Sequence, residues 1–260
     1  MLDVRVVKLG GNELDRPAWL AECARALAHA GPVVVVHGGG QAVTALSRRL
    51  GLPVERREGL RVTPPEVAEV VEMVLAGPVN RLVVAALRAA GLDAIGLSGV
   101  DGGLLTAEPI AEKLGHVGEI VAVRSSLLES FLLAGLTPVV APVAPAAGYG
   151  GAGGRGSVPL NVNADHAAIA IAGALRAEEL LFVSDVPGVE VDGVTQPSLA
   201  TADIEALIAL GSATDGMAAK LRAAASALQG GAKAVRIGDL DLFRSATAGT
   251  RILAAAGQPA

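Results

Sequence analysis

Two lysines and a set of glycine-rich turns are the residues whose types and spacing suggest chemistry in this chain. Lys8 is followed by Gly10 and Gly11, and Lys220 stands near the start of an Ala-rich helical pattern. Glycine lets the backbone approach a ligand and direct its N–H groups at an anion. The spacing is not that of a Walker loop, and a lone lysine at a strand end is more often simply solvated. Together, these residues predict a site that neutralises an anionic group.

A second glycine run, His37-Gly-Gly-Gly40, directly precedes a helical pattern. The first N–H groups of a helix are unpaired and its dipole is positive there, so this turn suits a carboxylate or a phosphate. The glycine spacing of a dinucleotide-binding fold is not satisfied. A tight turn without a ligand remains the alternative.

Three further polar segments accompany the glycine turns. Arg61 stands just before a helix that begins with proline, and a guanidinium can grip a carboxylate with two parallel hydrogen bonds. Asn161, Asn163 and Asp165 surround a predicted helix start, where N-capping is the simpler explanation. The segment Ser184–Gly188 ends a predicted strand with turn residues. A sheet with this many polar strand ends predicts a binding site along one edge.

The elements that must position these residues alternate along the chain. Nearly continuous apolar runs predict strands covered on both faces: Val4–Leu9, Pro32–His37, Thr137–Pro142 and Glu179–Val183. Helical spacing predicts helices over Pro17–His29, Ala42–Leu50, Pro65–Ala76, Val79–Ala90, Leu127–Ala134, Ala164–Ala174, Thr201–Leu210 and Met217–Gly230. This alternation predicts an α/β fold with helices on both faces of a parallel or mixed sheet. Ligands of such sheets bind at the carboxyl ends of the strands, where the glycine turns lie.

Composition excludes several classes of protein. The net charge is -5 and aromatic residues make up 2% of the 260 residues, which argues against a nucleic-acid partner. Cys23 is the only cysteine, so the chain forms neither an intramolecular disulfide nor a cysteine zinc site. Its apolar runs are broken well short of the roughly 20 residues that span a bilayer, and the N-terminus lacks a signal peptide. We therefore expect a cytoplasmic protein without a membrane partner.

The ordered set of motifs resembles the amino acid kinase family and, within it, the acetylglutamate kinases. The resemblance spans nearly the whole chain and rests on Lys8–Gly11, His37–Gly40, Gly59–Thr63, Gly115–Gly118, Asn161–Asp165, Ser184–Gly188, Thr214–Lys220 and Gly249–Leu253. It implies a single domain over residues 1–260, folded as an open three-layer αβα sandwich with a mainly parallel central sheet. It also implies an N-terminal lobe, about 1–163, for acylamino-acid binding and dimerisation, and an ATP-binding C-terminal lobe, about 164–260.

The resemblance further implies a role for each matching residue. Lys8 and Lys220 would stabilise the transferring phosphoryl group, and Asp165 would orient them. The acylglutamate site would comprise Gly39, Gly40, Arg61 and Asn161. ATP would be bound by Gly10, Gly11, Ser184, Asp185, Val186, Gly188, Ser212, Ala213 and Thr214. We expect Mg²⁺ to bind mainly through the ATP phosphates, with no metal ligand from the protein, although Asp165 is an alternative ligand. The glycine-rich loop 148–157 departs from the family pattern and is either a flexible loop or a mobile flap.

The reaction implied is the ATP-dependent phosphorylation of the side-chain carboxylate of N-acetyl-L-glutamate, the second step of arginine biosynthesis. A carboxylate is already ionised at pH 7, so no general base is needed. One alternative is a kinase of carrier-protein-linked aminoadipate or glutamate in lysine biosynthesis, for which Arg56 and Arg57 would supply a basic rim. Another is a non-catalytic amino-acid sensor, against which the presence of both Lys8 and Lys220 argues.

The resemblance also bears on assembly. Arginine-inhibited members of the family carry an additional N-terminal helix that links dimers into a ring. Only seven residues precede Lys8, and they are mostly predicted strand, which is too short for an independent helix. We therefore expect a homodimer that is insensitive to arginine.

Overall fold

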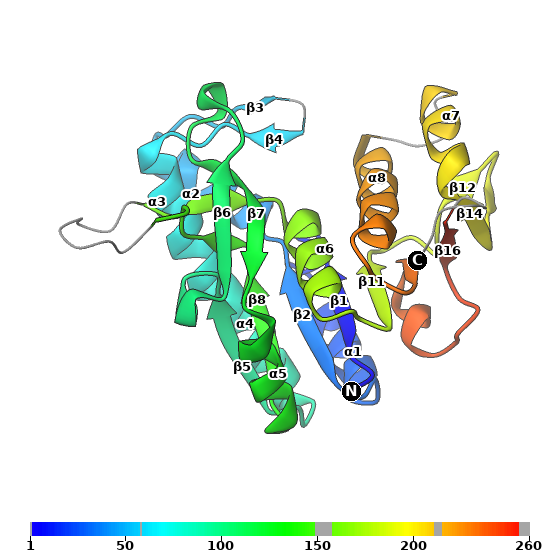
Figure 1. Ribbon diagram of the computed structural model, residues 1–260. Coiled ribbons are helices and arrows are strands. Elements are labelled where there is room, and N and C mark those ends of the chain that lie inside the picture. The colour runs from blue at the N-terminus through cyan, green and yellow to red at the C-terminus, as the bar shows by residue number, and fades with distance from the viewer. Residues whose placement is uncertain (1, 58, 149–157, 211–214, 255–260) are drawn as a thin grey trace.

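An eight-stranded sheet forms the centre of the protein (Figure 1). The computed structural model describes residues 2–57, 59–148, 158–210 and 215–254. In spatial order the strands are β14 (Ser198–Ala200), β16 (Thr250–Leu253), β15 (Val235–Gly238), β11 (Glu179–Val183), β1 (Arg5–Leu9), β2 (Val33–His37), β8 (Thr137–Ala141) and β5 (Ala94–Ser98). All neighbours are parallel except β15 and β16. The predicted mainly parallel sheet is confirmed.

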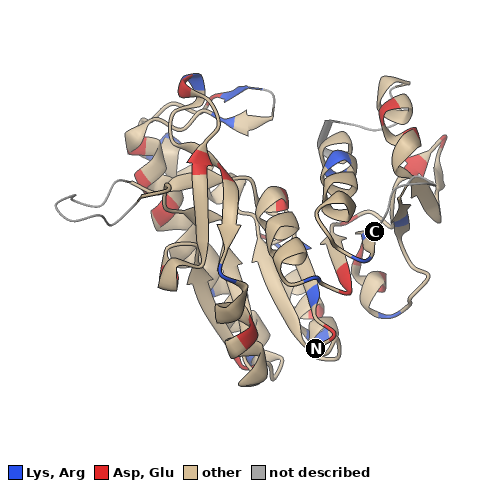
Figure 2. Ribbon diagram, viewed as in Figure 1, with Lys and Arg blue, Asp and Glu red and all other residues tan. Residues whose placement is uncertain are grey.

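Helices cover both faces of this sheet, because its central strands are apolar on both sides. Val7, Leu9 and Val35 face one core with α1 (Pro17–Leu27), α3 (Pro65–Val74) and α4 (Asn80–Ala89). Val6 and Val34 face a second core with α5 (Ser125–Leu133), α6 (Ala164–Ala174) and α8 (Asp215–Gln229). In Figure 2, the ribbon segments coloured for charged residues lie mainly on the helices and loops. The structure is therefore the expected three-layer αβα sandwich.

Smaller elements surround the sandwich. A second sheet has the order β6 (Leu105–Pro109), β7 (Val117–Val123), β10 (Leu160–Val162) and β9 (Val143–Ala144). Two hairpins pair β3 (Arg56–Arg57) with β4 (Leu60–Arg61), and β12 (Glu190–Val191) with β13 (Val194–Thr195). The remaining helical elements are α2 (Gly40–Arg49), α7 (Ile204–Ala209) and the short turns η2 (Asp101–Gly103), η3 (Glu112–Leu114), η4 (Thr201–Asp203) and η5 (Leu240–Phe243). The helix expected over Thr201–Leu210 is thus divided between η4 and α7.

The helices α3 and α4 are joined without a loop, which differs from the two separate helices expected there. A π turn, η1 (Leu75–Val79), connects them, and Gly77 inside it has non-helical dihedral angles next to Pro78. Glycine and proline at a π turn are ordinary causes of a helix kink. The joined stretch Pro65–Ala89 is long and apolar enough to span a membrane by length and composition alone, but half of its apolar window is buried inside the fold. It is a core helix of the sandwich.

Arg236 ties the C-terminal strands to the loop that follows them. Its side chain is buried and donates from Nε and Nη2 to the Glu179 carboxylate at 2.6 and 3.0 Å. It also donates to three backbone carbonyl oxygens, those of Leu242, Ser245 and Ala248, at 2.8 to 3.2 Å. A single guanidinium therefore holds β15 beside β11 and fixes the segment that leads to β16.

We expect Arg236→Met to lower the free energy of unfolding by about 3 to 5 kcal/mol, because it leaves the largely buried Glu179 carboxylate with only the more exposed Arg5, 3.8 Å away, as an ionic partner. Arg236→Lys should also destabilise, since an ammonium lacks the planar fork of donors. Urea denaturation measures both effects. The control is Arg222→Met, which removes the exposed pair with Glu205 and should leave the midpoint nearly unchanged. Equal midpoint shifts in the Arg236 and Arg222 variants would contradict this account.

Candidate active site

The site begins where three parallel strands end at the same edge. Leu9 at the end of β1 pairs with Val183 of β11 on one side and with His37 of β2 on the other. The segments that follow these strands are therefore neighbours: the Gly10–Gly11 turn, the Ser184–Gly188 segment and the Gly38–Gly40 turn. The prediction that polar strand ends share one edge is confirmed for these three segments, whereas Arg61 on β4 and Asn161 on β10 belong to two other sheets.

The two glycine turns pack backbone against backbone. A Cβ atom on Gly11 would lie 2.6 Å from the backbone nitrogen of Gly39, and one on Gly38 would lie 2.9 Å from the nitrogen of Gly11. Gly39 has a φ of +152°, which residues with a Cβ rarely adopt, and it is the N-cap of α2. Packing alone thus requires glycine at these positions, and it also presents the N-terminus of α2 at the edge of the sheet.

Lys8 and Asp165 meet across this edge. Lys8 Nζ lies 2.7 Å from Asp165 Oδ1, and the Lys8 side chain is 10% exposed. Asp165 stands in the first turn of α6, where Asn163 caps the helix by accepting from the backbone N–H groups of Asp165 and His166. N-capping therefore explains Asn163, while Asp165 faces the site as its predicted role requires.

Lys220 on α8 belongs to the same electrostatic environment. Burial lowers the pKa of Lys220, and the positive charge of Lys8 lowers it further. The carboxylates of Asp165, Glu13 and Asp185 act in the opposite direction and raise that pKa. The structure thus places the two predicted catalytic lysines close enough to repel each other, with acidic groups around them.

Glu13 is a residue of this site that sequence analysis missed. It lies in the turn between β1 and α1 with only 5% of its surface exposed, and its carboxylate packs against Gly10. Among the described residues, its Oε2 has no hydrogen-bond partner. The sequence offered one signal, an acidic side chain five residues after Lys8 in an otherwise glycine-rich turn.

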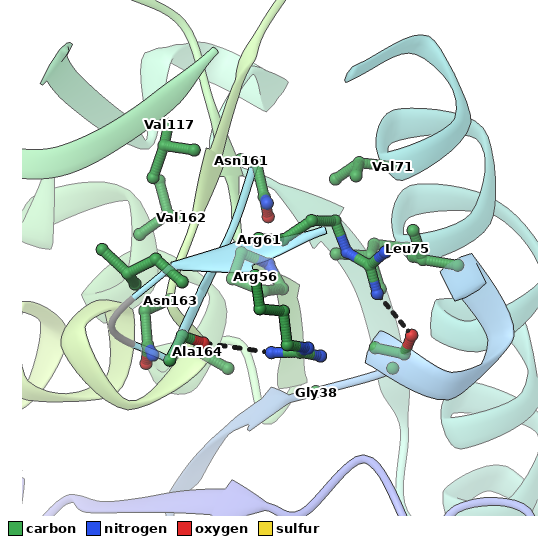
Figure 3. Close-up of a pocket in the computed structure, with 16 residues that line it drawn as sticks. Gly38, Arg56, Arg61, Val71, Leu75, Val117, Asn161, Val162, Asn163 and Ala164 are labelled. Carbon is green, nitrogen blue, oxygen red and sulfur yellow. Dashed lines mark hydrogen bonds between the residues drawn. The ribbon is translucent and has the colours of Figure 1, made fainter. Parts of the chain in front are cut away.

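A cavity of about 140 Å³ is lined by all four predicted acylglutamate-binding residues, Gly39, Gly40, Arg61 and Asn161 (Figure 3). Its other walls are largely apolar and are formed by Val43, Leu60, Val71, Leu75, Val117, Pro142 and Val162. Figure 3 shows Arg61 and Arg56 reaching into it, with Val71 and Leu75 on the helix opposite. The cavity therefore suits a small anion that also carries apolar groups.

Arg61 is the main polar group of this cavity. Its Nη2 donates to the carbonyl of Gly40 at 2.8 Å and to Thr44 Oγ1 at 2.6 Å. Its Nη1 is buried and has no partner among the described residues. Burial lowers the pKa of Arg61, and so does the positive charge of Arg56. Two guanidiniums held together in this way favour binding of a carboxylate.

A second hollow, of about 540 Å³, lies next to the Arg61 cavity and includes Lys8 and Asp165. Gly38–Gly40, Arg56, Asn163 and Ala164 line both, so these residues form a shared wall. The second hollow also contains Lys8, Asp165 and Gly11. Lys8 and the Arg61 cavity therefore lie on either side of a shared set of residues.

The predicted nucleotide-binding residues are placed less uniformly. Ser184 is buried at the end of β11, whereas Asp185 is exposed and lies 3.6 Å from an Arg16 nitrogen. Val186 is half-buried. A Cβ on Gly188 would lie 2.7 Å from Thr250 Oγ1, so packing already requires glycine there. The predicted residues Ser212, Ala213 and Thr214 lie outside the described residues, as does 149–157 of the glycine-rich loop.

Comparison with known proteins agrees with this geometry. Residues 3–239 match the model of the Amino acid kinase family. An acetylglutamate kinase of Chloroflexus aurantiacus is 47% identical over 244 residues, which cover 92% of this chain and 93% of the relative. An acetylglutamate kinase of Geobacillus kaustophilus is 46% identical over 226 residues, covering 86% and 84%. The crystal structure of a Streptococcus mutans protein superposes with a TM-score of 0.82 at 28% identity, covering 97% of this chain and 99% of that one.

We expect Glu13→Gln to lower the pKa of Lys220 further, because a neutral amide of the same shape removes one of the charges that raise it. Lys220 would then lose its proton at a lower pH than in the unmodified protein. NMR titration of labelled lysine side chains measures this, with Lys220→Ala to assign the signal. Glu22→Gln, which alters a carboxylate paired with Arg244, is the control. A Lys220 titration that is identical in Glu13→Gln and Glu22→Gln would contradict the placement of Glu13.

Proposed function

This chain belongs to the amino acid kinase family, and on that premise we propose that it transfers the γ-phosphoryl group of ATP to the side-chain carboxylate of N-acetyl-L-glutamate. The reaction belongs to arginine biosynthesis. The observation that carries the proposal is the wall of Gly38–Gly40 shared by the Arg61 cavity and the Lys8–Asp165 hollow. Relatives named acetylglutamate kinase, similar over most of both chains, support the choice of substrate.

The acceptor cavity distinguishes the two ends of acetylglutamate. The unpartnered Nη1 of Arg61 is available to the α-carboxylate, while Asn161, whose Nδ2 donates to Thr63 Oγ1 at 3.1 Å, lines the same wall. The apolar walls accommodate the methylene and acetyl groups. Anchoring the α-carboxylate at Arg61 directs the side-chain carboxylate toward the glycine turns and Lys8.

The chemistry requires charge neutralisation more than proton transfer. The acceptor carboxylate is ionised at pH 7 and attacks the γ-phosphorus directly, while the bond between that phosphorus and the bridging oxygen of the leaving ADP breaks. Lys8 and Lys220 counter the negative charge that spreads over the transferred group. Asp165 keeps the ammonium of Lys8 in place, and the N–H groups of the glycine turns add donors.

The residues at this edge fit ATP phosphates. The turns that contain Gly11 and Gly39 are in direct backbone contact and carry no side chains at these positions. Their backbone N–H groups would therefore be the donors to an incoming anion. No group of three or more His, Cys, Asp or Glu side chains among the described residues is arranged to hold a metal. We propose that Mg²⁺ binds mainly through phosphate oxygens and water, as this ion usually does, with Asp165 as the alternative protein ligand. When bound, it would neutralise phosphate charge.

The two alternative functions have less support. A carrier-protein-linked substrate would need a basic rim, but Arg57 Nε is paired with Glu55 Oε1 at 2.7 Å and Arg56 Nη1 donates to the Gly59 carbonyl at 3.1 Å. A non-catalytic sensor has no use for the buried Lys8–Asp165 pair.

Assembly, lobe roles and location are also proposals. We propose a homodimer, and exposed apolar side chains on α3 and α4, Met73 and Leu82, are available to a partner subunit. The assignment of residues 1–163, approximately, to acylamino-acid binding and of about 164–260 to ATP binding stays a prediction. The two segments are not separate units, because α6 packs on strands from both. We propose a cytoplasmic location by analogy with the biosynthetic enzymes it resembles.

We expect Lys8→Ala and Lys220→Ala each to lower kcat by about 10² to 10³ with a smaller effect on KM for acetylglutamate, because their charges matter most in the transition state. Steady-state kinetics with ATP and acetylglutamate test this, with thermal melts to confirm folding. Lys233→Ala, at an exposed pair with Glu178, is the control. A Lys8 or Lys220 variant with the turnover of the control would lose its catalytic role.

We expect Arg61→Lys to weaken acetylglutamate binding about tenfold or more while ATP affinity stays unchanged, because an ammonium cannot reproduce the guanidinium fork. Calorimetric titration with each ligand separates the two effects. Arg57→Lys, on the same hairpin but paired with Glu55, is the matched control. Loss of ATP affinity with normal acetylglutamate affinity would move Arg61 out of the acceptor site.

A further inference from the structure

A fully buried polar pair, His37 and Asn80, lies behind the glycine turn of the active site. His37 is the last residue of β2 and has no exposed surface, and Asn80 is 1% exposed at the start of α4. Neither side chain is among the described residues that line the two active-site cavities. Buried polar groups are costly unless they form hydrogen bonds, so a pair in this place needs an explanation.

The hydrogen bonds of Asn80 fix its orientation. Its Nδ2 lies 2.9 Å from the carbonyl oxygen of Val139 and 3.4 Å from that of Leu97. Carbonyl oxygens only accept, so the atom facing them must be the NH₂ group. The same Nδ2 lies 3.1 Å from His37 Nε2, and therefore Nε2 must be the acceptor in that contact.

The other ring nitrogen of His37 faces the glycine turn. Nδ1 lies 2.8 Å from the carbonyl oxygen of Gly38, which again can only accept. His37 is therefore neutral with its hydrogen on Nδ1, and both of its ring nitrogens are used. Burial supports the neutral form, because it lowers the pKa of His37 to about 4.

This hydrogen bond constrains the peptide between Gly38 and Gly39. In a planar trans peptide the C=O and N–H bonds point in opposite directions. Holding the Gly38 carbonyl toward the imidazole therefore directs the Gly39 N–H away from it. Gly39 lines both cavities, so the peptide that His37 holds belongs to the wall that the two cavities share.

The π turn holds Gly39 from a second direction. A Cβ on Gly39 would lie 2.6 Å from Leu75 Cδ2 and 3.2 Å from Val79 Cγ1, both of which belong to η1. Asn80 follows that turn directly. The kink thus places two apolar side chains against Gly39 and one amide against His37, all from the short stretch Leu75–Asn80.

We propose that His37 and Asn80 are positioning residues that orient the Gly38–Gly39 peptide for binding the anionic groups of the reaction. They act through the backbone and do not touch the substrate. The expected effect of these residues on turnover rests on the proposed function. The hydrogen bonds by which they orient the peptide do not depend on which substrate is used.

The structural part is tested by NMR of the protein labelled with ¹⁵N-histidine, which has four histidines. We expect His37 to be in the Nδ1–H form and to keep it between pH 5 and 8. Asn80→Leu should shift both the His37 ring signals and, in uniformly ¹⁵N-labelled protein, the Gly39 amide signal. Val83→Ala, which shortens a fully buried side chain one turn further along α4, should shift neither. An Nε2–H tautomer in the unmodified protein, or equal shifts in the two variants, would overturn the proposal.

The functional part is tested with two substitutions of His37 that preserve different features. The Nδ2 of asparagine can occupy the place of the Nδ1 donor, whereas leucine has no donor. We expect His37→Leu to lower kcat about 10- to 100-fold and His37→Asn to recover part of that loss, with Val83→Ala near the unmodified rate once folding is confirmed. Equal losses in His37→Leu and His37→Asn, or unmodified turnover in both, would overturn the positioning role. Absence of acetylglutamate turnover in the unmodified protein would instead contradict the proposed function and leave the NMR result to decide this inference.

Discussion

Close contact between two backbone turns is the constraint on which the rest of the site depends. The turns after β1 and β2 approach so closely that a single methyl group on Gly11 or Gly38 would collide with the opposite backbone. This contact places Lys8, the N-terminus of α2 and the Arg61 cavity around a common wall. It is possible because β1 and β2 are adjacent, parallel and in register, so that they end at the same level. The geometry of the sheet is therefore also the geometry of the site.

The charged groups follow from that arrangement. Two lysines that are partly buried near each other would be unfavourable by themselves, and the lowered pKa of Lys220 reflects this. Asp165, Glu13 and Asp185 compensate in part. A bound anion would complete the compensation, which explains why the fold tolerates a cluster that burial and repulsion both disfavour. In the acceptor cavity, Arg61 beside Arg56 presents the same situation.

Much of the sandwich could be predicted from sequence because its central strands are unbroken apolar runs. β11 and α6 begin and end at the predicted residues, and α1, α2 and α5 agree within about two residues at each end. β5 was missed because small residues such as Gly96 dilute its pattern, and β15 and β16 because Arg236 and Arg251 interrupt theirs. In the second sheet, β10 pairs with β7 across a long stretch of chain, which local periodicity does not reveal. Glu13 was missed because its burial depends on packing against Gly10.

The position of β1 has a consequence for how the protein is made. This strand is synthesised before both of its neighbours, yet it lies in the interior of the sheet between β2 and β11. Its neighbour β2 follows within about 30 residues, but its other neighbour, β11, is synthesised much later. Asp165, which pairs with Lys8, is synthesised only shortly before β11. Until those residues have been synthesised, one side of β1 presents unpaired backbone groups and the ammonium of Lys8 lacks its partner Asp165. An unpaired strand edge can pair with another chain, so the order of synthesis exposes the central strand of the sheet to that hazard.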